Sequence, residues 1–204
     1  MRAQATELDR LLASIRACRH CVEAPDRQPL PHEPRPVLRV SRTARLAVCS
    51  QAPGTRVHAS GIPFTDASGD RLRDWMGVSP QEFYDERRVA IIPMGFCFPG
   101  QDANGGDLPP RGECAKLWHP SLFARLPQLE LVLSVGSYSQ RWHLGDAAGD
   151  SLQATMRDWR QHLRQRRVLP LPHPSWRNNG WLKRNPWFEE ELLPVLRREV
   201  RSLL

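Results

Sequence analysis

The stretch RLAVCSQAPG, residues 45–54, sets the pattern on which the fold prediction depends. A short apolar run stops at a turn that contains proline and glycine, as expected for a strand followed by a loop. Three similar runs follow, at 88–96 (RVAIIPMGF), 129–137 (LELVLSVGS) and 166–174 (RRVLPLPHP). None of them alternates apolar with polar residues, which is typical of strands that are buried on both faces.

Helical patterns separate and follow these runs, so strand and helix alternate four times along the chain. The helical segments are 69–77, 79–87, 111–126, 151–165 and 185–204. This alternation predicts a single-domain three-layer α/β/α fold, in which helices flank a central, four-stranded, mainly parallel sheet. Within the last segment, Pro194 is expected to kink or restart the helix.

The first 44 residues precede this pattern, and we expect them to pack on the same domain, which spans residues 1–204. Residues 4–17 read as an amphipathic helix, and residues 25–36 contain five prolines and must form an extended loop. No run of about 18 apolar residues is present, so no membrane span is predicted. The start of the chain also lacks the apolar core of a signal peptide, so we expect a cytoplasmic protein. We also expect it to act as a monomer.

The net charge is +7, from 29 lysines and arginines against 22 acidic residues. A basic surface of this kind suits a polyanionic partner such as nucleic acid. Charge alone does not select the partner, because a bias toward arginine in the genome produces the same excess.

Five cysteines in a reducing compartment favour a metal site or buried thiols over disulfides. Cys18 and Cys21 form a C-x-x-C pair, Cys97 ends the second apolar run, and Cys114 lies near the start of a predicted helix. Four thiolates can bind zinc or an iron–sulfur cluster. Cys49, inside the first predicted strand, is interpreted as a core residue.

In parallel sheets of this kind, ligands bind where the strands end at their carboxyl edge. The loop SGIPFTDASGD, residues 60–70, belongs to that edge because it follows the first predicted strand. Two readings of it remain open. Either Phe64 fills a hydrophobic gap while Asp66 caps the next helix, or a flat ligand stacks on Phe64 while Asp66 takes part in chemistry.

Taken in order, these features resemble the uracil-DNA glycosylase superfamily, specifically its iron–sulfur branches, families 4 and 5. The four cysteines resemble the cluster ligands of those families in order and approximate spacing, and SQAPG at 50–54 resembles their first motif. GIPFTDASGDRL at 61–72 is similar to a family 5 loop in which Phe stacks on the extruded base and Asp positions or activates water. HPSWRN at 173–178 resembles the second motif, whose His contacts the base and stabilises charge as the sugar bond breaks. The resemblance covers the chain from about Cys18 to beyond His173.

The resemblance implies a role for each matching residue. Its implied catalytic residues are Asp66 and His173. Its implied base contacts are Gln51, Ala52, Phe64, Asn104 and Ser175. Its implied DNA contacts in the first motif are Pro53 and Gly54. The charged residues that flank the motif loops are also expected to contact DNA, and they are Arg56, Arg177, Lys183 and Arg184. Its implied ligands of a 4Fe–4S cluster, with zinc as the alternative metal, are Cys18, Cys21, Cys97 and Cys114.

Three positions depart from the family pattern. Gln51 stands where family 4 has a glutamate, Pro93 where family 4 has a base-reading asparagine, and Asp102 where family 5 has an asparagine. A carboxylate accepts hydrogen bonds but cannot donate to a uracil carbonyl as an amide can. The identity of the base is therefore left open by the sequence.

The sequence thus predicts a monofunctional DNA glycosylase that removes uracil or another deaminated or modified base during base excision repair. Two alternatives remain. One is a glycosylase of the same fold that acts on a different modified base. The other is a protein that binds damaged or single-stranded DNA without cutting it.

Overall fold

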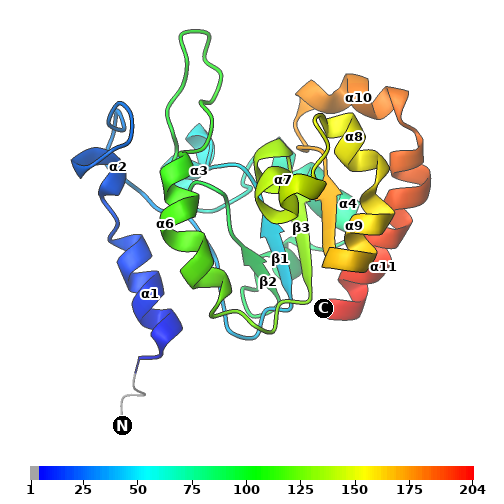
Figure 1. Cartoon of the computed structure of the whole chain (residues 1–204), viewed down its shortest axis with the longest axis horizontal. Helices are drawn as coiled ribbons and strands as arrows, with labels where there is room; N and C mark the ends of the chain where they lie inside the picture. Colours follow the sequence, from blue (N-terminus) through cyan, green and yellow to red (C-terminus); the bar gives the residue numbers. More distant parts are fainter. Residues whose placement is uncertain (1–4) are drawn as a thin grey trace.

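The structure is a computed structural model and describes residues 5–204. Its centre is a four-stranded parallel sheet formed by β1 (Leu46–Cys49), β2 (Val89–Ile91), β3 (Leu131–Val135) and β4 (Val168–Leu171). The strand order is β2-β1-β3-β4, and every neighbouring pair is parallel. Helices lie on both sides of this sheet (Figure 1), so the predicted three-layer α/β/α fold is confirmed.

Successive strand side chains point to opposite faces of the sheet, and two separate hydrophobic cores result. Leu46 and Val48 of β1 belong to the core under α4 (Ala67–Met76), α9 (Trp159–Arg166) and α11 (Leu193–Leu203). Ala47 and Cys49 belong to the other core, under α1 (Glu7–Arg16) and α6 (Gly112–Phe123). Because both faces are covered, the strands can be apolar throughout, which is the pattern seen in the sequence. Cys49 is fully buried, as its interpretation as a core residue requires.

The N-terminal segment packs on the second core. Leu8, Leu12 and Ile15 of α1 are buried there. Thr6 caps this helix, because its hydroxyl accepts a hydrogen bond from the Asp9 N–H at 3.2 Å. The helix was expected over 4–17, and residue 4 lies outside the residues that the structure describes.

The remaining helical elements are short and connect the strands. They are α2 (His20–Glu23), α3 (Thr55–Ser60), α5 (Pro80–Tyr84), α7 (Ser137–Leu144), η1 (Gly145–Ala147), α8 (Leu152–Arg157), η2 (Trp176–Asn178) and α10 (Asn179–Arg184). At the end of the chain, a π-helical turn, η3 (Phe188–Leu192), precedes α11. Pro194 lies at the start of α11, so the predicted restart of the last helix is confirmed. No helix within residues 5–204 is long and apolar enough to cross a membrane.

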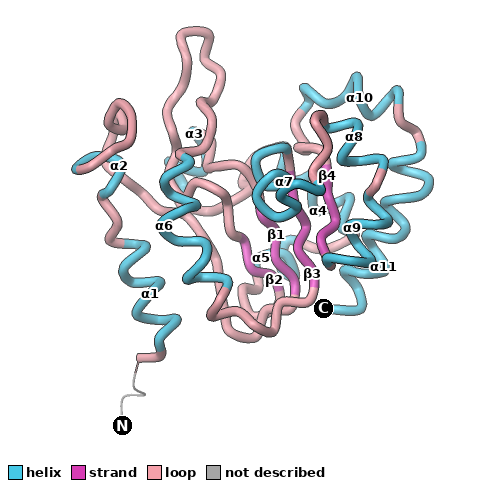
Figure 2. The backbone as a smooth tube through the Cα atoms, in the orientation of Figure 1, coloured by secondary structure: helices cyan, strands magenta, loops and turns pink. Residues whose placement is uncertain are grey.

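A long loop follows β2, which ends at Ile91 and therefore well before Cys97, where the sequence pattern had placed its end. Part of this loop, residues 98–110, projects beyond the carboxyl edge of the sheet, and we call it the finger (Figures 1 and 2). An antiparallel bridge between Gln101 and Asp107 closes its base. The finger thus brings part of the second loop over the ends of the strands.

Candidate active site

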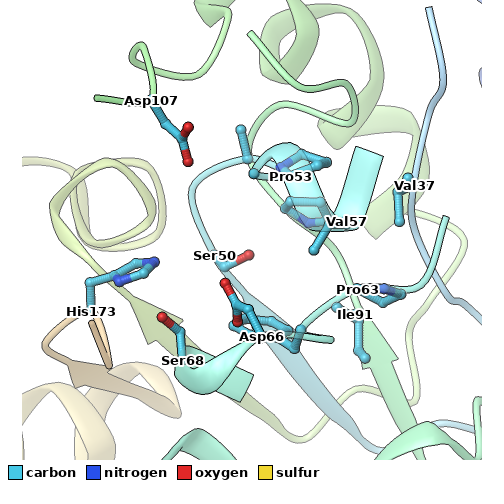
Figure 3. A pocket seen from close by; sticks show the side chains of 14 residues that line it. Val37, Ser50, Pro53, Val57, Pro63, Asp66, Ser68, Ile91, Asp107 and His173 are labelled. Atoms are coloured by element: carbon cyan, nitrogen blue, oxygen red, sulfur yellow. The ribbon is translucent and has the colours of Figure 1, made fainter. Parts of the chain in front are cut away.

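One cavity lies at the carboxyl edge of the sheet, and residues from four loops line it (Figure 3). One side of the cavity is apolar, and the other carries hydroxyl, carboxyl and imidazole groups. The apolar lining consists of Val37, Ala52, Pro53, Val57, Pro63, Phe64, Ile91 and Pro93. The polar side chains are Ser50, Asp66, Ser68, Asp107 and His173. A flat ligand with polar edges fits a site of this composition.

Phe64 belongs both to the cavity wall and to the edge of the first core. Its ring packs edge-on against Phe83 with a centroid distance of 5.8 Å, and only 8% of the residue is exposed. Its backbone has a φ of 56°, which is uncommon for a bulky residue. The Phe64 carbonyl accepts hydrogen bonds from Arg73 at 3.2 Å and from the Tyr84 hydroxyl at 3.0 Å. These contacts stabilise an unfavourable backbone conformation, as is often found at functional sites.

Gly69 allows this loop to approach the start of α4 closely. A Cβ atom at this position would lie 1.9 Å from the Phe64 carbonyl oxygen. Any side chain at residue 69 would therefore displace the loop that carries Phe64.

Asp66 caps α4 and also lines the cavity, so both readings of this residue agree with the structure. Its Oδ1 accepts a hydrogen bond from the Gly69 N–H at 3.0 Å. Within residues 5–204, no hydrogen bond engages its Oδ2. The capping contact thus orients the carboxylate and leaves an oxygen available on the cavity side.

His173 follows β4 and faces the cavity from the side opposite α3 (Figure 3). Burial is the largest influence on its imidazole and lowers the pKa from 6.5. Of the neighbouring charges, Asp66 and Asp107 raise this pKa, whereas Arg177 lowers it. The Asn178 side-chain amide donates to the His173 carbonyl at 2.7 Å and so holds the turn after the strand. The lowered pKa means that the ring is mainly neutral at pH 7, with one nitrogen free to donate a hydrogen bond.

Asp107, at the base of the finger, was not predicted as a site residue. Its carboxylate points into the cavity in Figure 3, and its Oδ1 accepts from Gln101 Nε2 at 3.2 Å. Ser50 and Ser68 were also missed. The positions of Ser50 and Asp107 in the sequence could have indicated them. Ser50 ends the first apolar run, and Asp107 lies in the loop after the second run, which a parallel sheet brings to the same edge.

Three predicted base contacts do not line the cavity. Gln51 packs against Gly136, where an added Cβ would lie 2.8 Å from Gln51 Nε2. Asn104 is exposed in the finger, and the Ser175 carbonyl accepts a hydrogen bond from Arg71 at 3.3 Å. Ala52, by contrast, lines the cavity, and its contact with a base stays a prediction.

The predicted DNA contacts divide into two groups. Pro53 and Gly54 line the cavity. The charged residues are exposed, and they are Arg56, Arg177, Lys183 and Arg184. Beside them Trp176 is 74% exposed, and the Arg177 guanidinium lies 5.9 Å from the centroid of its ring. An exposed tryptophan next to a cation offers a surface on which a base can stack.

The four predicted cluster ligands line a second cavity on the α1 side of the molecule. Cys18 and Cys21 come from the segment around α2, Cys97 from the loop after β2, and Cys114 from α6. Burial is the main cause that raises the pKa of Cys97 and of Cys114 to about 12 each; the neighbouring thiols act in the same direction, and a backbone hydrogen bond to each thiol acts against it. Cys49 lies apart from them in β1.

Within the described part of the chain, no three histidine, cysteine, aspartate or glutamate side chains are grouped so that they could hold a metal ion. A shared cavity is therefore what the structure provides for these four thiols, and ligation of a metal stays a prediction. Arg111 also lines this cavity, and its Nη1 lies 3.8 Å from Glu113 Oε1, an ion pair that is too long for a hydrogen bond.

The amino-acid sequence was compared with models of protein families, and one model matches most of the chain. The model of the uracil DNA glycosylase superfamily matches residues 39–197, which include all four strands, the finger and the loops that carry Asp66 and His173. Members of that superfamily are DNA glycosylases, which are hydrolases that act on DNA. The chain therefore belongs to the uracil DNA glycosylase superfamily.

Proposed function

We propose that this protein hydrolyses the N-glycosidic bond of uracil, or of another deaminated or modified base, in DNA. The observation that carries the proposal is that Asp66 and His173 line one cavity of which Phe64 forms part of the wall. In the reaction, the bond between the base nitrogen and C1′ breaks and a bond between C1′ and a water oxygen forms. The departing base takes up a proton, and an abasic site remains in the DNA.

Two opposite charges develop as the bond breaks, and Asp66 and His173 each suit one of them. Positive charge develops on the sugar, where the Asp66 carboxylate stabilises it and orients the attacking water. Negative charge develops on a base oxygen, to which the neutral His173 imidazole donates a hydrogen bond. A neutral imidazole is sufficient for this role, which agrees with the lowered pKa of His173.

The reaction is proposed to be monofunctional, which means that no covalent enzyme–sugar intermediate forms. A Schiff-base route would need an amine next to C1′. No lysine lines the cavity in the described part of the chain, and the carboxylates there favour direct attack by water.

The base has to leave the DNA stack before it reaches this cavity. Extrusion costs a few kcal/mol, and least for an unpaired base. Stacking on the Phe64 ring offsets about 1–3 kcal/mol of that cost. The exposed cations Arg56, Arg177, Lys183 and Arg184 are proposed to hold the flanking phosphates.

We further propose that Cys18, Cys21, Cys97 and Cys114 hold a 4Fe–4S cluster. Four thiols from three segments around one cavity fit a cluster, in which each thiolate binds a different iron atom. The Arg111 guanidinium lines the same cavity and lowers the pKa of Cys21, which favours its thiolate, although Glu113, its ion-pair partner at 3.8 Å, acts in the opposite direction. When bound, the cluster supplies a cross-link between the α1 side and the loop after β2. Zinc is the alternative; because all four thiolates would bind one ion, at about 2.3 Å each, it would require the thiols to lie closer together than a cluster does.

We propose that the protein is cytoplasmic. None of the five cysteines, all within the described residues, forms a disulfide, as expected in a reducing compartment. We propose that the protein acts there as a monomer.

The test is a strand-cleavage assay on labelled oligonucleotides that carry uracil, hypoxanthine, xanthine or hydroxymethyluracil at one position. After incubation with the protein, alkali cleaves the DNA at every abasic site that has formed. We expect cleavage with at least one of these bases, and only after alkali. Binding of such DNA without any cleavage would instead support the non-catalytic alternative. Cleavage before alkali treatment would contradict the monofunctional route.

A further inference from the structure

Phe64 has a backbone conformation that bulky residues rarely adopt. Within residues 5–204, two residues other than glycine have a positive φ, Phe64 at 56° and Arg167 at 53°. Arg167 ends α9 in the left-handed conformation that is common after a helix. Phe64 instead lies in a turn before α4, at a kind of position that glycine or asparagine usually takes, and it lines the active-site cavity. Such a conformation persists only where the surrounding structure fixes it.

Arg73 and Tyr84 hold the carbonyl group of Phe64. The Tyr84 hydroxyl lies 3.0 Å from the carbonyl oxygens of both Pro63 and Phe64, to which it donates. Arg73 Nη1 donates to the Phe64 carbonyl at 3.2 Å and to the Tyr84 hydroxyl oxygen, also at 3.2 Å. A carbonyl oxygen has two lone pairs, so it can accept both donors. Because the direction of this carbonyl depends on the backbone dihedral angles, these bonds favour the observed conformation of Phe64.

Arg73 and Tyr84 are themselves fixed by their neighbours, and neither of them lines the cavity. The Arg73 side chain is 11% exposed, and its Nη2 donates to Asp70 at 2.6 Å. The Arg73 guanidinium also lies 5.5 Å from the centroid of the Tyr84 ring. Arg39 donates to the Tyr84 carbonyl at 2.9 Å, and its guanidinium lies 5.2 Å from the same ring centroid. Arg73 and Tyr84 therefore act on the site through the backbone that carries the Phe64 ring.

We propose that Arg73 and Tyr84 are positioning residues that keep Phe64 in its left-handed conformation, so that its ring forms the cavity wall before DNA binds. Without their hydrogen bonds, rotation to a negative φ relieves the strain and turns the ring away from the cavity. A base that enters would then have to restore the strained conformation, which reduces the benefit of stacking. This proposal rests on the proposed glycosylase function and names the residues that support its base-binding surface.

The test is a double-mutant cycle on the excision rate. Tyr84→Phe removes only the hydroxyl, and Phe64→Leu removes the flat ring while keeping most of the buried volume. Single-turnover rates are measured for the wild type, both single variants and the double variant, on a single-stranded oligonucleotide that carries a base the wild type excises. If Tyr84 acts through the Phe64 ring, Tyr84→Phe should slow excision by about tenfold in the wild type and by less than about twofold in Phe64→Leu. A merely structural role would slow both backgrounds by the same factor.

The matched control is Tyr138→Phe, which makes the same change at the other of the two tyrosines in the chain. Tyr138 is exposed on α7 and does not line the cavity, so loss of its hydroxyl should leave the rate unchanged in both backgrounds. Arg73→Lys keeps the positive charge but loses the planar fork that bonds the Phe64 carbonyl and Asp70 at the same time. It should slow excision with the same dependence on the residue at position 64.

A crystal structure of the variant that combines Arg73→Lys with Tyr84→Phe gives a measurement independent of activity. It should show Phe64 with a negative φ, and a retained positive φ with the ring in the cavity wall would overturn the proposal. Equal slowing by Tyr84→Phe in both backgrounds, or no slowing in either, would also overturn it while leaving the glycosylase function in place. If the wild type excises no base, the proposed function itself fails, and this proposal fails with it. Should Tyr84→Phe melt at a much lower temperature than the wild type, the same cycle with Arg73→Lys decides between these outcomes.

Discussion

Burial of the His173 imidazole lowers its pKa, and the Asp66 carboxylate, which lines the same cavity, raises it. The two residues come from loops after different strands, β4 and β1, which are separated by β3 in the sheet. Their electrostatic coupling therefore depends on the assembled fold. It also provides a way to test their proposed roles separately.

Asp66→Asn should leave folding nearly unchanged, because asparagine caps a helix about as well as aspartate. The single-turnover excision rate should fall by about 10²–10⁴, which is typical of a positioned acid or base. Asp74→Asn is the control, since Asp74 is an exposed carboxylate of the same helix that does not line the cavity. If Asp66→Asn retains the wild-type rate, Asp66 is only a helix cap.

The pKa of the His173 imidazole should lie below 6.5, because burial is the main influence on it. An NMR titration of the ring measures this pKa directly, which is preferable to a rate profile because both the neutral and the protonated ring can donate a hydrogen bond. Asp66→Asn removes a charge that raises this pKa, so His173 should titrate at still lower pH in the variant. A pKa above 6.5, or one that moves upward in the variant, would contradict the assigned coupling.

Folding stability should also decrease in acid because of two other histidines. Burial lowers the pKa of His119 and of His143 to about 4 each. In the unfolded chain these groups bind protons near 6.5, so acid favours unfolding. The free energy of unfolding should thus decline as the pH falls from about 6.5 toward 4, as measured by urea titration. His143→Phe, which keeps an aromatic ring beside Phe123, should show a shallower decline.

Phe64 has two roles in the structure, and two substitutions separate them. Phe64→Ala removes its contact with Phe83 and should lower the free energy of unfolding by about 3 kcal/mol. Phe64→Leu keeps most of the buried volume and should cost less than about 1.5 kcal/mol. Both variants lose the flat ring, so both should bind an extruded base more weakly, by about 1–3 kcal/mol. Wild-type excision by Phe64→Leu would argue against base stacking.

The cysteine cavity is tested by iron analysis of protein purified without oxygen. The wild type should contain about four iron atoms per chain and show the broad visible absorbance of a 4Fe–4S cluster. Cys97→Ser should lose iron and unfold at a lower temperature. Cys49→Ser alters a cysteine that lies outside this cavity and should keep its iron. A colourless wild type with one zinc ion per chain would favour the alternative metal.

DNA affinity should decrease steeply with salt, since each phosphate contact releases counterions. Arg177→Ala should weaken binding to all sequences and reduce the salt slope by about one. Trp176→Ala should weaken binding through lost stacking and leave that slope unchanged. Arg10→Ala, an exposed charge on α1, serves as the control. Equal slopes in all proteins would exclude Arg177 as a phosphate contact.

Much of the site followed from the sequence because its residues lie in the connections that follow buried strands. Asp66 and His173 were predicted from loops that follow the first and fourth apolar runs, and a parallel sheet brings such loops to one edge. The finger behaved differently. Asn104 was predicted there as a base contact, whereas Asp107 is the finger residue that lines the cavity. A loop rich in glycine and proline has no periodicity from which the direction of a side chain can be inferred.

By itself the sequence determined the order of the four strands and of the longer helices between them, since apolar runs that are buried on both faces form the interior of a layered α/β fold. The short helices α3, α7 and α10 were not predicted. It also determined which loops share the ligand-binding edge. Only the tertiary structure decided which side chains of those loops face the cavity. Gln51 turns toward Gly136, and Asp107 is held over Gly54 by Gln101. Such choices depend on close contacts between segments far apart in the chain, and a local pattern of residue types does not encode them.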